Sequence, residues 1–327
     1  MSRRALALFL VMGVIWGIPY LLIRVAVRDV APPTLVFLRT APAALLLLPL
    51  AVRAGRLRAV RARWRWVLAY TVVELAVPWL TLSRAEQRLD SSASGLLVAG
   101  TPLLAAVLYP LVTRSAHFGR RRAAGLLAGF VGVAALVGLD LRGADPWAVA
   151  EVAVTAAGYA AGPLIISRRL GDLPGLGVVT ASLVLTAVAY APFALTDLPH
   201  HLPAEAVASV AVLAVVCTAL AFVVFFELVG EIGPARSVVI TYLNPAVAVL
   251  LGIAFLHEPF SAGIAVGFPL IIAGSVLATA GGDGGGSAEL ALPGAPDGGD
   301  LEAERLVDGD HRPVGPCVPG DDGRGAR

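Results

Sequence analysis

The chain has 327 residues, of which 57% are hydrophobic and only 15% are charged, and its formal net charge is +2 at pH 7. This balance excludes an ordinary soluble globular domain, because so many apolar residues would leave large hydrophobic patches in water. The apolar residues come in long runs separated by short charged breaks, which is typical of a protein that crosses a membrane many times.

Ten apolar runs are long enough to cross a bilayer, whose hydrocarbon core needs about 20 helical residues. The runs are continuous instead of alternating, so they predict an all-α membrane protein and exclude a transmembrane β-barrel. We expect the first run to be an uncleaved helix, because no small-residue cleavage site closes a short apolar core. The predicted spans are residues 5–23, 33–52, 66–83, 92–113, 122–139, 147–166, 175–195, 207–228, 235–256 and 262–280.

Arginine is distributed unevenly between the breaks. If the N-terminus is cytoplasmic, the inner breaks hold fourteen arginines and the outer breaks hold five. The excess of positive charge on the inner side predicts a multi-pass protein of the cytoplasmic (inner) membrane with both termini in the cytoplasm. Residues 281–327 are rich in Gly, Pro and Asp and lack apolar periodicity, so they predict a disordered cytoplasmic tail.

An internal repeat divides the apolar part of the chain. A shift of 143 residues aligns the two halves without a gap from about residue 16 to 112, and a shift of 142 continues the match. Each half holds five spans, an odd number, so the second half is inverted relative to the first. The predicted repeats are residues 1–140 and 141–280. The matched pairs include Pro49 with Pro192, Pro102 with Pro245, Gly125 with Gly267 and Gly132 with Gly274.

Three motifs resemble the EamA family of the drug/metabolite transporter superfamily. Trp16-Gly17-Ile18-Pro19-Tyr20 resembles its W-G-x-N-F/Y pattern, and Pro33 with Leu38-Arg39 is similar to its P…L-R pattern. Asn244–Gly252, followed by Leu256-His257-Glu258-Pro259, resembles the signature that closes each EamA half. The resemblance implies ten helices in two repeats and export or exchange of amino acids, other metabolites or drugs. Pro19, Ser115 and His257 depart from the family pattern, and these departures concern the identity of the substrate more than the fold.

Two charged residues lie well away from the ends of predicted spans. Glu74 lies near the middle of the third span and Arg39 lies in the second. A charge at that depth costs about 2.5–3.5 kcal/mol on insertion scales and normally faces a partner or a cavity. Because the two spans are neighbours and antiparallel, we predict that Arg39 and Glu74 meet. The pair is either a structural ion pair or a proton-sensitive site that binds or couples substrate.

Two repeat-related prolines, Pro102 and Pro245, lie at the centres of spans four and nine. Each removes a backbone N–H and frees the carbonyl four residues earlier, at Val98 and at Thr241. They mark either a kink that improves packing or a hinge that lines a site on the axis between the repeats. Further along span nine, we expect Gly252 and Glu258 to be structural, with Glu258 closing the outer end of the span.

Aromatic residues also lie within the spans. Trp16 and Tyr20 in the first span, and Tyr159 as the repeat mate of Trp16, are either core residues or an aromatic lining for the substrate. Trp79 lies closer to a span end and is expected to anchor the helix at the membrane interface. The predicted substrate pathway comprises Trp16, Tyr20, Arg39, Glu74, Tyr159, Thr241 and Asn244.

These features together predict a secondary transporter that exports a small metabolite by alternating access. A phosphate-binding Gly-rich loop is missing, so ATP consumption is not expected, nor is any catalytic residue, cofactor or metal. The expected partners are a small-molecule substrate, the lipid bilayer, either a proton or a counter-substrate, and a second copy of the chain in a homodimer, but no nucleic acid. The alternatives are an intramembrane enzyme acting on a lipid-linked substrate and a non-transporting membrane scaffold.

Overall fold

The computed structural model describes residues 2–113, 119–139, 145–199, 201–233 and 237–279. The predicted tail, 281–327, and Ser115 lie outside these residues. Eight helices are long and apolar enough to cross a membrane, and two shorter apolar helices, Ile240–Leu256 and Ala262–Ala278, complete the ten predicted spans. The described residues form an all-α multi-pass membrane protein, as the sequence predicts.

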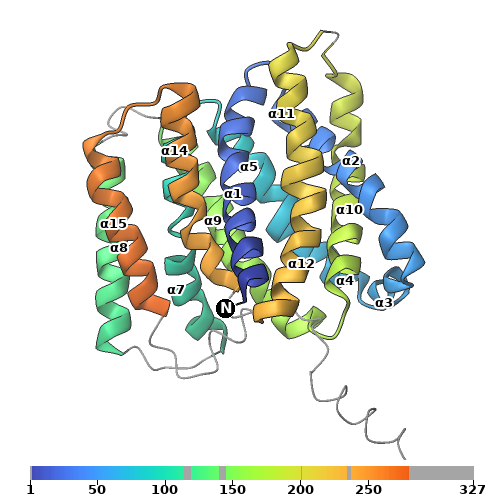
Figure 1. Ribbon diagram of the computed structural model, residues 1–327, viewed down its shortest axis with the longest axis horizontal. Coiled ribbons are helices and arrows are strands. Elements are labelled where there is room, and N and C mark those ends of the chain that lie inside the picture. The colour runs from blue at the N-terminus through green and yellow to red at the C-terminus, as the bar shows by residue number, and fades with distance from the viewer. Residues whose placement is uncertain (1, 114–118, 140–144, 200, 234–236, 280–327) are drawn as a thin grey trace, which may run out of the picture. The chain divides into compact units, whose positions relative to one another are not determined.

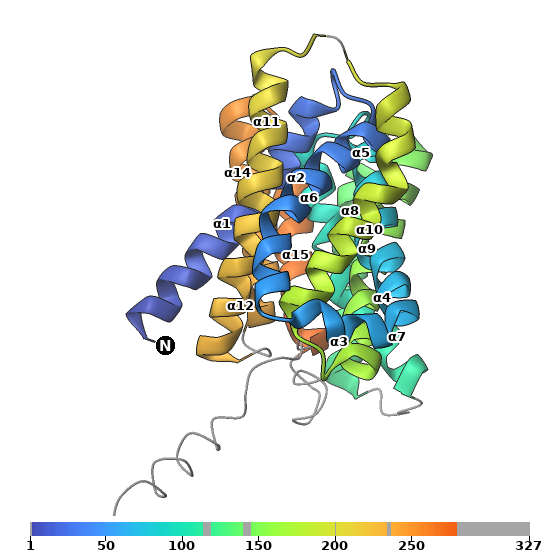
Figure 2. The same cartoon turned by 90° about the vertical axis from the view of Figure 1, so that its right-hand side faces the viewer.

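The first half contains five spans. They are α1 (Arg3–Ala26); α2 (Pro32–Arg53); a third span of α4 (Trp64–Tyr70), η1 (Thr71–Ala76) and α5 (Val77–Ala85); a fourth of α6 (Ser91–Val98) and α7 (Thr101–Thr113); and α8 (Arg120–Leu139). A short helix, α3 (Arg56–Ala62), lies in the arginine-rich break before α4 and was not predicted. Figure 2 shows α3 beside α4 and α10, which it contacts.

The second half repeats this order. Its spans are α9 (Pro146–Ile165) with η2 (Ile166–Leu170); α10 (Gly175–Thr196); α11 (Ala204–Ala214), η3 (Val215–Leu220) and α12 (Ala221–Ile232); η4 (Val238–Tyr242) with α14 (Asn244–Leu256); and α15 (Ala262–Thr279). Alternate breaks lie at opposite ends of the helices. The end with residues 86–90 and 257–261 is called the Glu258 end, and the end with residues 54–63 and 171–174 is called the Arg63 end.

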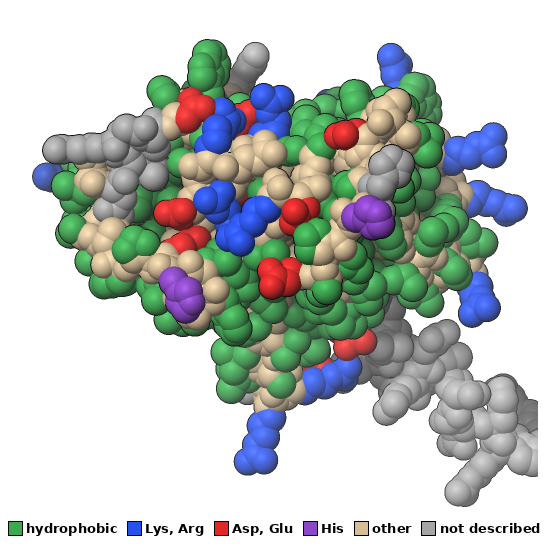
Figure 3. All heavy atoms as spheres, turned by 90° about the horizontal axis from the view of Figure 1, so that it is seen from above, with side chains coloured by type: hydrophobic (Ala, Val, Ile, Leu, Met, Phe, Trp, Pro, Cys, Tyr) green, Lys and Arg blue, Asp and Glu red, His purple; other side chains and the backbone are tan. Residues whose placement is uncertain are grey.

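The outer surface of the helices is apolar. Leu195 is 82% exposed and Leu45 is 70% exposed, and many other large hydrophobic side chains point outward in the same way. Such a surface is unfavourable in water but matches the acyl chains of a bilayer. Charged side chains gather at the helix ends, and Figure 3 views the Glu258 end, where acidic and basic side chains are interspersed.

Helices of the two halves pair across the molecule. The helices α8 and α15 pack together, as do α2 and α10, and each pair joins a helix to its own repeat mate. Figure 1 shows α8 with α15 at one side of the helices and α2 with α10 at the other. Pairing of an element with its own mate is the property of a two-fold axis, which here relates the two inverted repeats.

Four glycines bring α8 and α15 into backbone contact. A Cβ atom on Gly125 would lie 2.8 Å from the Gly274 carbonyl oxygen, and one on Gly132 would lie 3.0 Å from the Gly267 carbonyl oxygen. Exchanging each glycine for its repeat mate turns the first contact into the second, so the contact is self-complementary. Small residues permit this approach, and in lipid such packing replaces the hydrophobic effect as the cohesive force.

We predict that Gly274→Val strongly destabilises the protein. A Cβ atom at this position would lie 2.6 Å from the Gly125 carbonyl oxygen, and the backbone of α8 cannot yield as a flexible side chain would. The expected loss is about 3 kcal/mol, measured as a lower midpoint of thermal unfolding in detergent. Gly138→Val is the matched control on α8, because nothing lies within 4 Å of its Cβ position. Equal melting temperatures for the two variants would contradict the close contact.

Candidate substrate site

Arg39 is a buried charged residue that contacts both halves. It lies on α2, its relative exposure is only 8%, and its Nε–H donates to the Thr218 hydroxyl on η3 at 3.0 Å. Its guanidinium carbon lies 3.8 Å from the centroid of the Trp79 ring, a cation–π contact. Arg39 therefore joins the first half to the second.

Four other residues lie near this guanidinium. Tyr20 from α1, Tyr159 from α9, Cys217 from η3 and Glu86, directly after α5, are close enough to interact with Arg39 electrostatically. Tyr159 is also within electrostatic range of Glu74. Of the predicted pathway residues, the structure thus brings Tyr20, Arg39 and Tyr159 together, and Glu74 neighbours Tyr159.

The predicted pairing of Arg39 with Glu74 is wrong for this conformation. Within the described residues, no ion pair joins them, and the Glu74 Oε2 atom is buried without a hydrogen-bond partner. Instead the carboxylate packs on α9, where a side chain on Gly162 would collide with it. Sequence spacing places a residue along its helix but does not give the direction in which each helix face points.

Glu74 lies in a π-helical turn that recurs in the other half. The π-helix η1 covers Thr71–Ala76 and η3 covers Val215–Leu220, which are offset by 144 residues. Such turns leave backbone carbonyls available, and they are frequent at functional sites. The Tyr190 hydroxyl donates to the Ala76 carbonyl at 2.9 Å, and the Thr218 hydroxyl donates to the Leu213 carbonyl at 2.7 Å. The contact partner of Arg39 is therefore itself part of a π-turn.

Pro102 and Pro245 both lie where a membrane span is interrupted. The helix α6 ends at Val98 and Pro102 falls in the first turn of α7, while Pro245 falls in the first turn of α14, after η4. The Val98 carbonyl, which the sequence predicts to be freed, accepts a hydrogen bond of 2.7 Å from the Thr101 hydroxyl. Each span is thus broken into two segments, a sharper change than the predicted kink.

Trp16 and Asn244 make contacts that hold helices together. The Trp16 ring lies 4.9 Å from that of Phe225 and 6.3 Å from that of Phe222, both on α12. With its amide group oriented to donate, Asn244 reaches the Gly13 carbonyl of α1 at 3.2 Å and the Ile240 carbonyl at 3.1 Å. These contacts fit the packing interpretation, and Thr241 lies half-buried in η4 nearby in the chain.

Glu258 closes the N-terminus of a helix in the opposite half. Its Oε1 atom accepts hydrogen bonds from the Ser91 N–H and hydroxyl, both at 2.8 Å, and its Oε2 atom accepts from the Ser92 N–H at 2.9 Å and the Ser92 hydroxyl. The carboxylate thereby satisfies two of the free N–H groups at the start of α6 and complements its dipole. Gly252 is required because a Cβ atom there would overlap the Glu258 carboxylate and the Ser92 hydroxyl.

His257 adopts a backbone conformation that suits glycine. Its φ is 55° and its ψ is 32°, and its N–H donates to the Gly252 carbonyl at the end of α14. We predict that His257→Gly stabilises the protein by about 0.5–1 kcal/mol, because glycine adopts this left-handed conformation without steric cost. The change would appear as a higher midpoint of thermal unfolding. His201→Gly is the control at an exposed position with ordinary φ, and an equal rise in both variants would refute the explanation.

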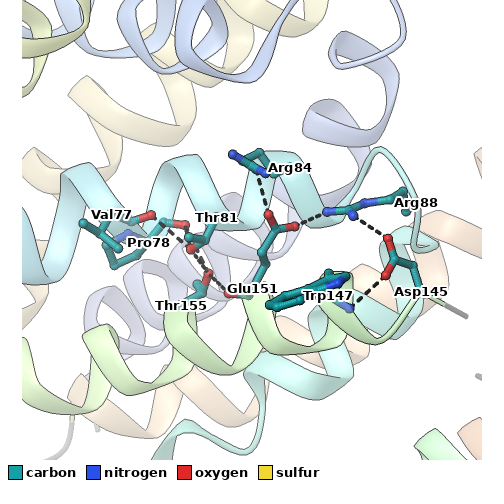
Figure 4. Close-up of polar contacts among 9 residues, drawn as sticks. All are labelled: Val77, Pro78, Thr81, Arg84, Arg88, Asp145, Trp147, Glu151 and Thr155. Carbon is teal, nitrogen blue, oxygen red and sulfur yellow. Dashed lines mark hydrogen bonds and ion pairs between the residues drawn. The ribbon is translucent and has the colours of Figure 1, made fainter.

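An ion-pair network joins the two halves at the Glu258 end (Figure 4). Arg84 of α5 pairs with Glu151 of α9 at 2.7 Å, and Arg88 contacts both Glu151 and Asp145. The Trp147 N–H donates to Asp145 at 2.9 Å, and this bond, together with Arg88, lowers the pKa of the Asp145 carboxyl. Beside the network, on the same two helices, the Thr81 and Thr155 hydroxyls lie 2.7 Å apart.

Glu86 was missed by the sequence analysis. It follows the last turn of α5, is fully buried, and neither carboxylate oxygen has a hydrogen-bond partner among the described residues. Burial raises the pKa of this carboxyl well above its usual range; Arg24 and Arg39 oppose the rise, and Glu258 adds to it.

The prediction that Trp79 anchors its helix at the membrane interface was wrong. Its ring is only 6% exposed and packs against the Arg39 guanidinium.

Comparison with known proteins agrees with this architecture. Three inner membrane transporters named YedA, described as uncharacterized, from Escherichia coli strain K12, O6:H1 and O157:H7, are each 26% identical over 278 residues, which cover 82% of this chain and 88% of the relative. A protein of known crystal structure shares the fold with a TM-score of 0.61 and 19% identity, covering 86% of this chain and 98% of that one. The model of the EamA-like transporter family matches residues 3–138 and 146–280, one match for each half. The chain therefore belongs to the EamA-like transporter family.

Proposed function

We propose that this transporter exports a small metabolite that carries a carboxylate group, such as an amino acid or a related compound, from the cytoplasm. The substrate binds between the two halves at Arg39, and alternating access exposes it to either side. Both termini lie in the cytoplasm, so the Arg63 end faces inward and the Glu258 end faces outward. The distribution of arginine supports this orientation, because positively charged breaks stay on the inner side.

The observation that carries this proposal is the arrangement around Arg39. An arginine within a membrane-spanning helix normally pairs with a carboxylate or a backbone carbonyl. Here only its Nε–H has an acceptor among the described residues, a neutral hydroxyl, and no carboxylate lies within ion-pair distance. The planar guanidinium presents further N–H groups that match the two oxygens of a carboxylate. Glu86 is within electrostatic range of Arg39 but forms no ion pair with it among the described residues, so a carboxylate on the substrate would supply a direct ion-pair partner.

Contacts at the Glu258 end support alternating access. The Arg84–Glu151 pair joins α5 to α9, and the Glu258 cap joins the end of α14 to α6, so each contact links the first half to the second. Rocking of one half against the other must release these contacts before the site opens at that end. This conformation is therefore assigned to a state closed at the Glu258 end.

The test is substrate counterflow in vesicles that contain the purified protein. Vesicles are loaded with an unlabelled mixture of amino and organic acids, and entry of labelled compounds is compared with protein-free vesicles. We expect carboxylates to exchange, and the methyl ester of each active compound to compete at least tenfold more weakly, since it loses the charge that Arg39 recognises. Preferential exchange of cationic or uncharged compounds would refute the proposed substrate class. Absence of all exchange would favour the enzyme or scaffold alternatives.

A further inference from the structure

A hollow at the Arg63 end lies apart from the Arg39 site. Its volume is about 400 Å³, and it is lined by Arg63, Trp64, Arg65, Trp66, Arg168 and Arg169. We call it the arginine hollow. It lies between the start of α4, in the first half, and η2, in the second. The positive-inside rule explains why arginines occur at this end, but not why four of them line one concave space with two tryptophans.

The charge in the arginine hollow is only partly neutralised. Arg63 forms a two-pronged ion pair with Asp172, which offsets its charge. Among the described residues, Arg168 donates only to the Val112 carbonyl, at 3.3 Å, and Arg169 stacks on the Trp66 ring at 4.5 Å. Arg65 has no hydrogen-bond or ion-pair partner in the part of the chain that the structure describes. Three cationic side chains are thus free to bind an anion, and guanidinium groups match the geometry of phosphate oxygens.

The surroundings of the arginine hollow are those of a lipid headgroup. Trp64 is 59% exposed and Trp66 is 40% exposed, and exposed tryptophans at a helix end typically lie at the level of the headgroups. From Trp64, an exposed apolar stripe continues along the third span through Leu68 and Val72 at four-residue spacing. This stripe can hold an acyl chain of a phospholipid while the phosphate of the same lipid reaches the arginine hollow at the end of the helix.

We propose that the arginine hollow binds the phosphate group of an anionic phospholipid, with an acyl chain lying along Trp64, Leu68 and Val72. Basic pockets between helix ends at the membrane surface have the charge and position that such headgroups require. The binding bridges α4 of the first half and η2 of the second. The proposal is independent of the transported substrate, because it uses no residue of the Arg39 site.

The experiment measures thermal unfolding of the purified protein in a neutral detergent during titration with phosphatidylglycerol. We expect phosphatidylglycerol to raise the melting temperature and phosphatidylcholine, at equal concentration, to leave it unchanged. In R65Q/R168Q the apparent affinity should fall about 30-fold, since each removed arginine contributes separately to attraction of an anionic lipid. Its melting temperature without lipid should match the wild type, because both side chains are exposed.

Two further arms separate this site from general attraction and from free phosphate. R58Q/R61Q removes the same charge from α3 at the same end, on exposed residues that do not line the hollow. This variant should keep its affinity within about twofold, and a loss equal to that of R65Q/R168Q would overturn the proposal. Glycerol phosphate at the same concentration should give no stabilisation. If it reproduces the effect of the lipid, the hollow binds a soluble phosphate ester and the lipid assignment is wrong.

Discussion

Replacing Arg39 with glutamine is expected to reduce counterflow of the carboxylate substrate by about 10- to 100-fold. The substitution removes the charge to which the proposed carboxylate would bond, and charge-assisted hydrogen bonds contribute about 1.5–3 kcal/mol. The remaining side chain can still bond to Thr218, so the cross-half contact seen in the structure is kept in part. The measurement is the initial rate of exchange at equal amounts of folded protein in the vesicles.

Two control variants make the Arg39 result specific. Arg39→Lys retains the charge but loses the planar fork and the contact with the Trp79 ring, so we expect an intermediate rate. Arg28→Gln removes an exposed arginine near the Glu258 end and should exchange at the wild-type rate. Normal exchange by Arg39→Gln would show that the carboxylate binds elsewhere and that Arg39 only holds α2 against η3.

The second large effect is expected at Glu258. Glu258→Gln keeps the shape of the side chain in the space left by Gly252, but it removes the charge and replaces one acceptor with an N–H₂ group facing two donors. Burying unsatisfied N–H groups at the start of α6 should cost about 2–4 kcal/mol. The expected reading is a fall of roughly 5–15 °C in the melting temperature in detergent.

Glu227→Gln is the matched control for this change. Glu227 pairs with Arg4 at the Arg63 end, and both side chains are more than half exposed, so its loss should cost less than about 1 kcal/mol. A small effect of Glu258→Gln, similar to that of the control, would mean that water or a neighbouring group caps α6 equally well. The Glu258 carboxylate would then not be needed for the stability of the protein.

The fold is predicted from the sequence at the level of the spans and the repeat. Long apolar runs fix where helices cross the membrane, because the cost of exposed backbone polar groups in lipid permits little else. The matched glycines were predicted only as repeat mates, and the structure adds that Gly125 and Gly132 meet Gly274 and Gly267 across the axis. The π-turns η1 and η3 could not be predicted. Gly and Pro indicate where a helix is interrupted, but no residue type indicates a π-turn.

The candidate site is predicted less completely. Arg39, Tyr20 and Tyr159 were chosen for their depth, and depth follows directly from the position in a span. Their partners depend on helix rotation, which a π-turn alters locally, and this explains why Glu74 faces Gly162 instead of Arg39. Thr218 and Glu86 gave no signal, because a threonine inside a helix and an acidic residue next to a short loop are ordinary features of membrane proteins.

The glycine contact between α8 and α15 limits how the two halves can move. Backbones that touch through glycine have no side chains between them that could change rotamer, so the line of contact can serve as the axis of rotation between the halves. If the halves rock about this axis, displacement is smallest along it and grows with distance from it. Figure 1 shows α2 and α10 at the far side of the helices from α8 and α15, and α2 carries Arg39. Spin-label distances between α2 and α10 should therefore change more between conformations than those between α8 and α15.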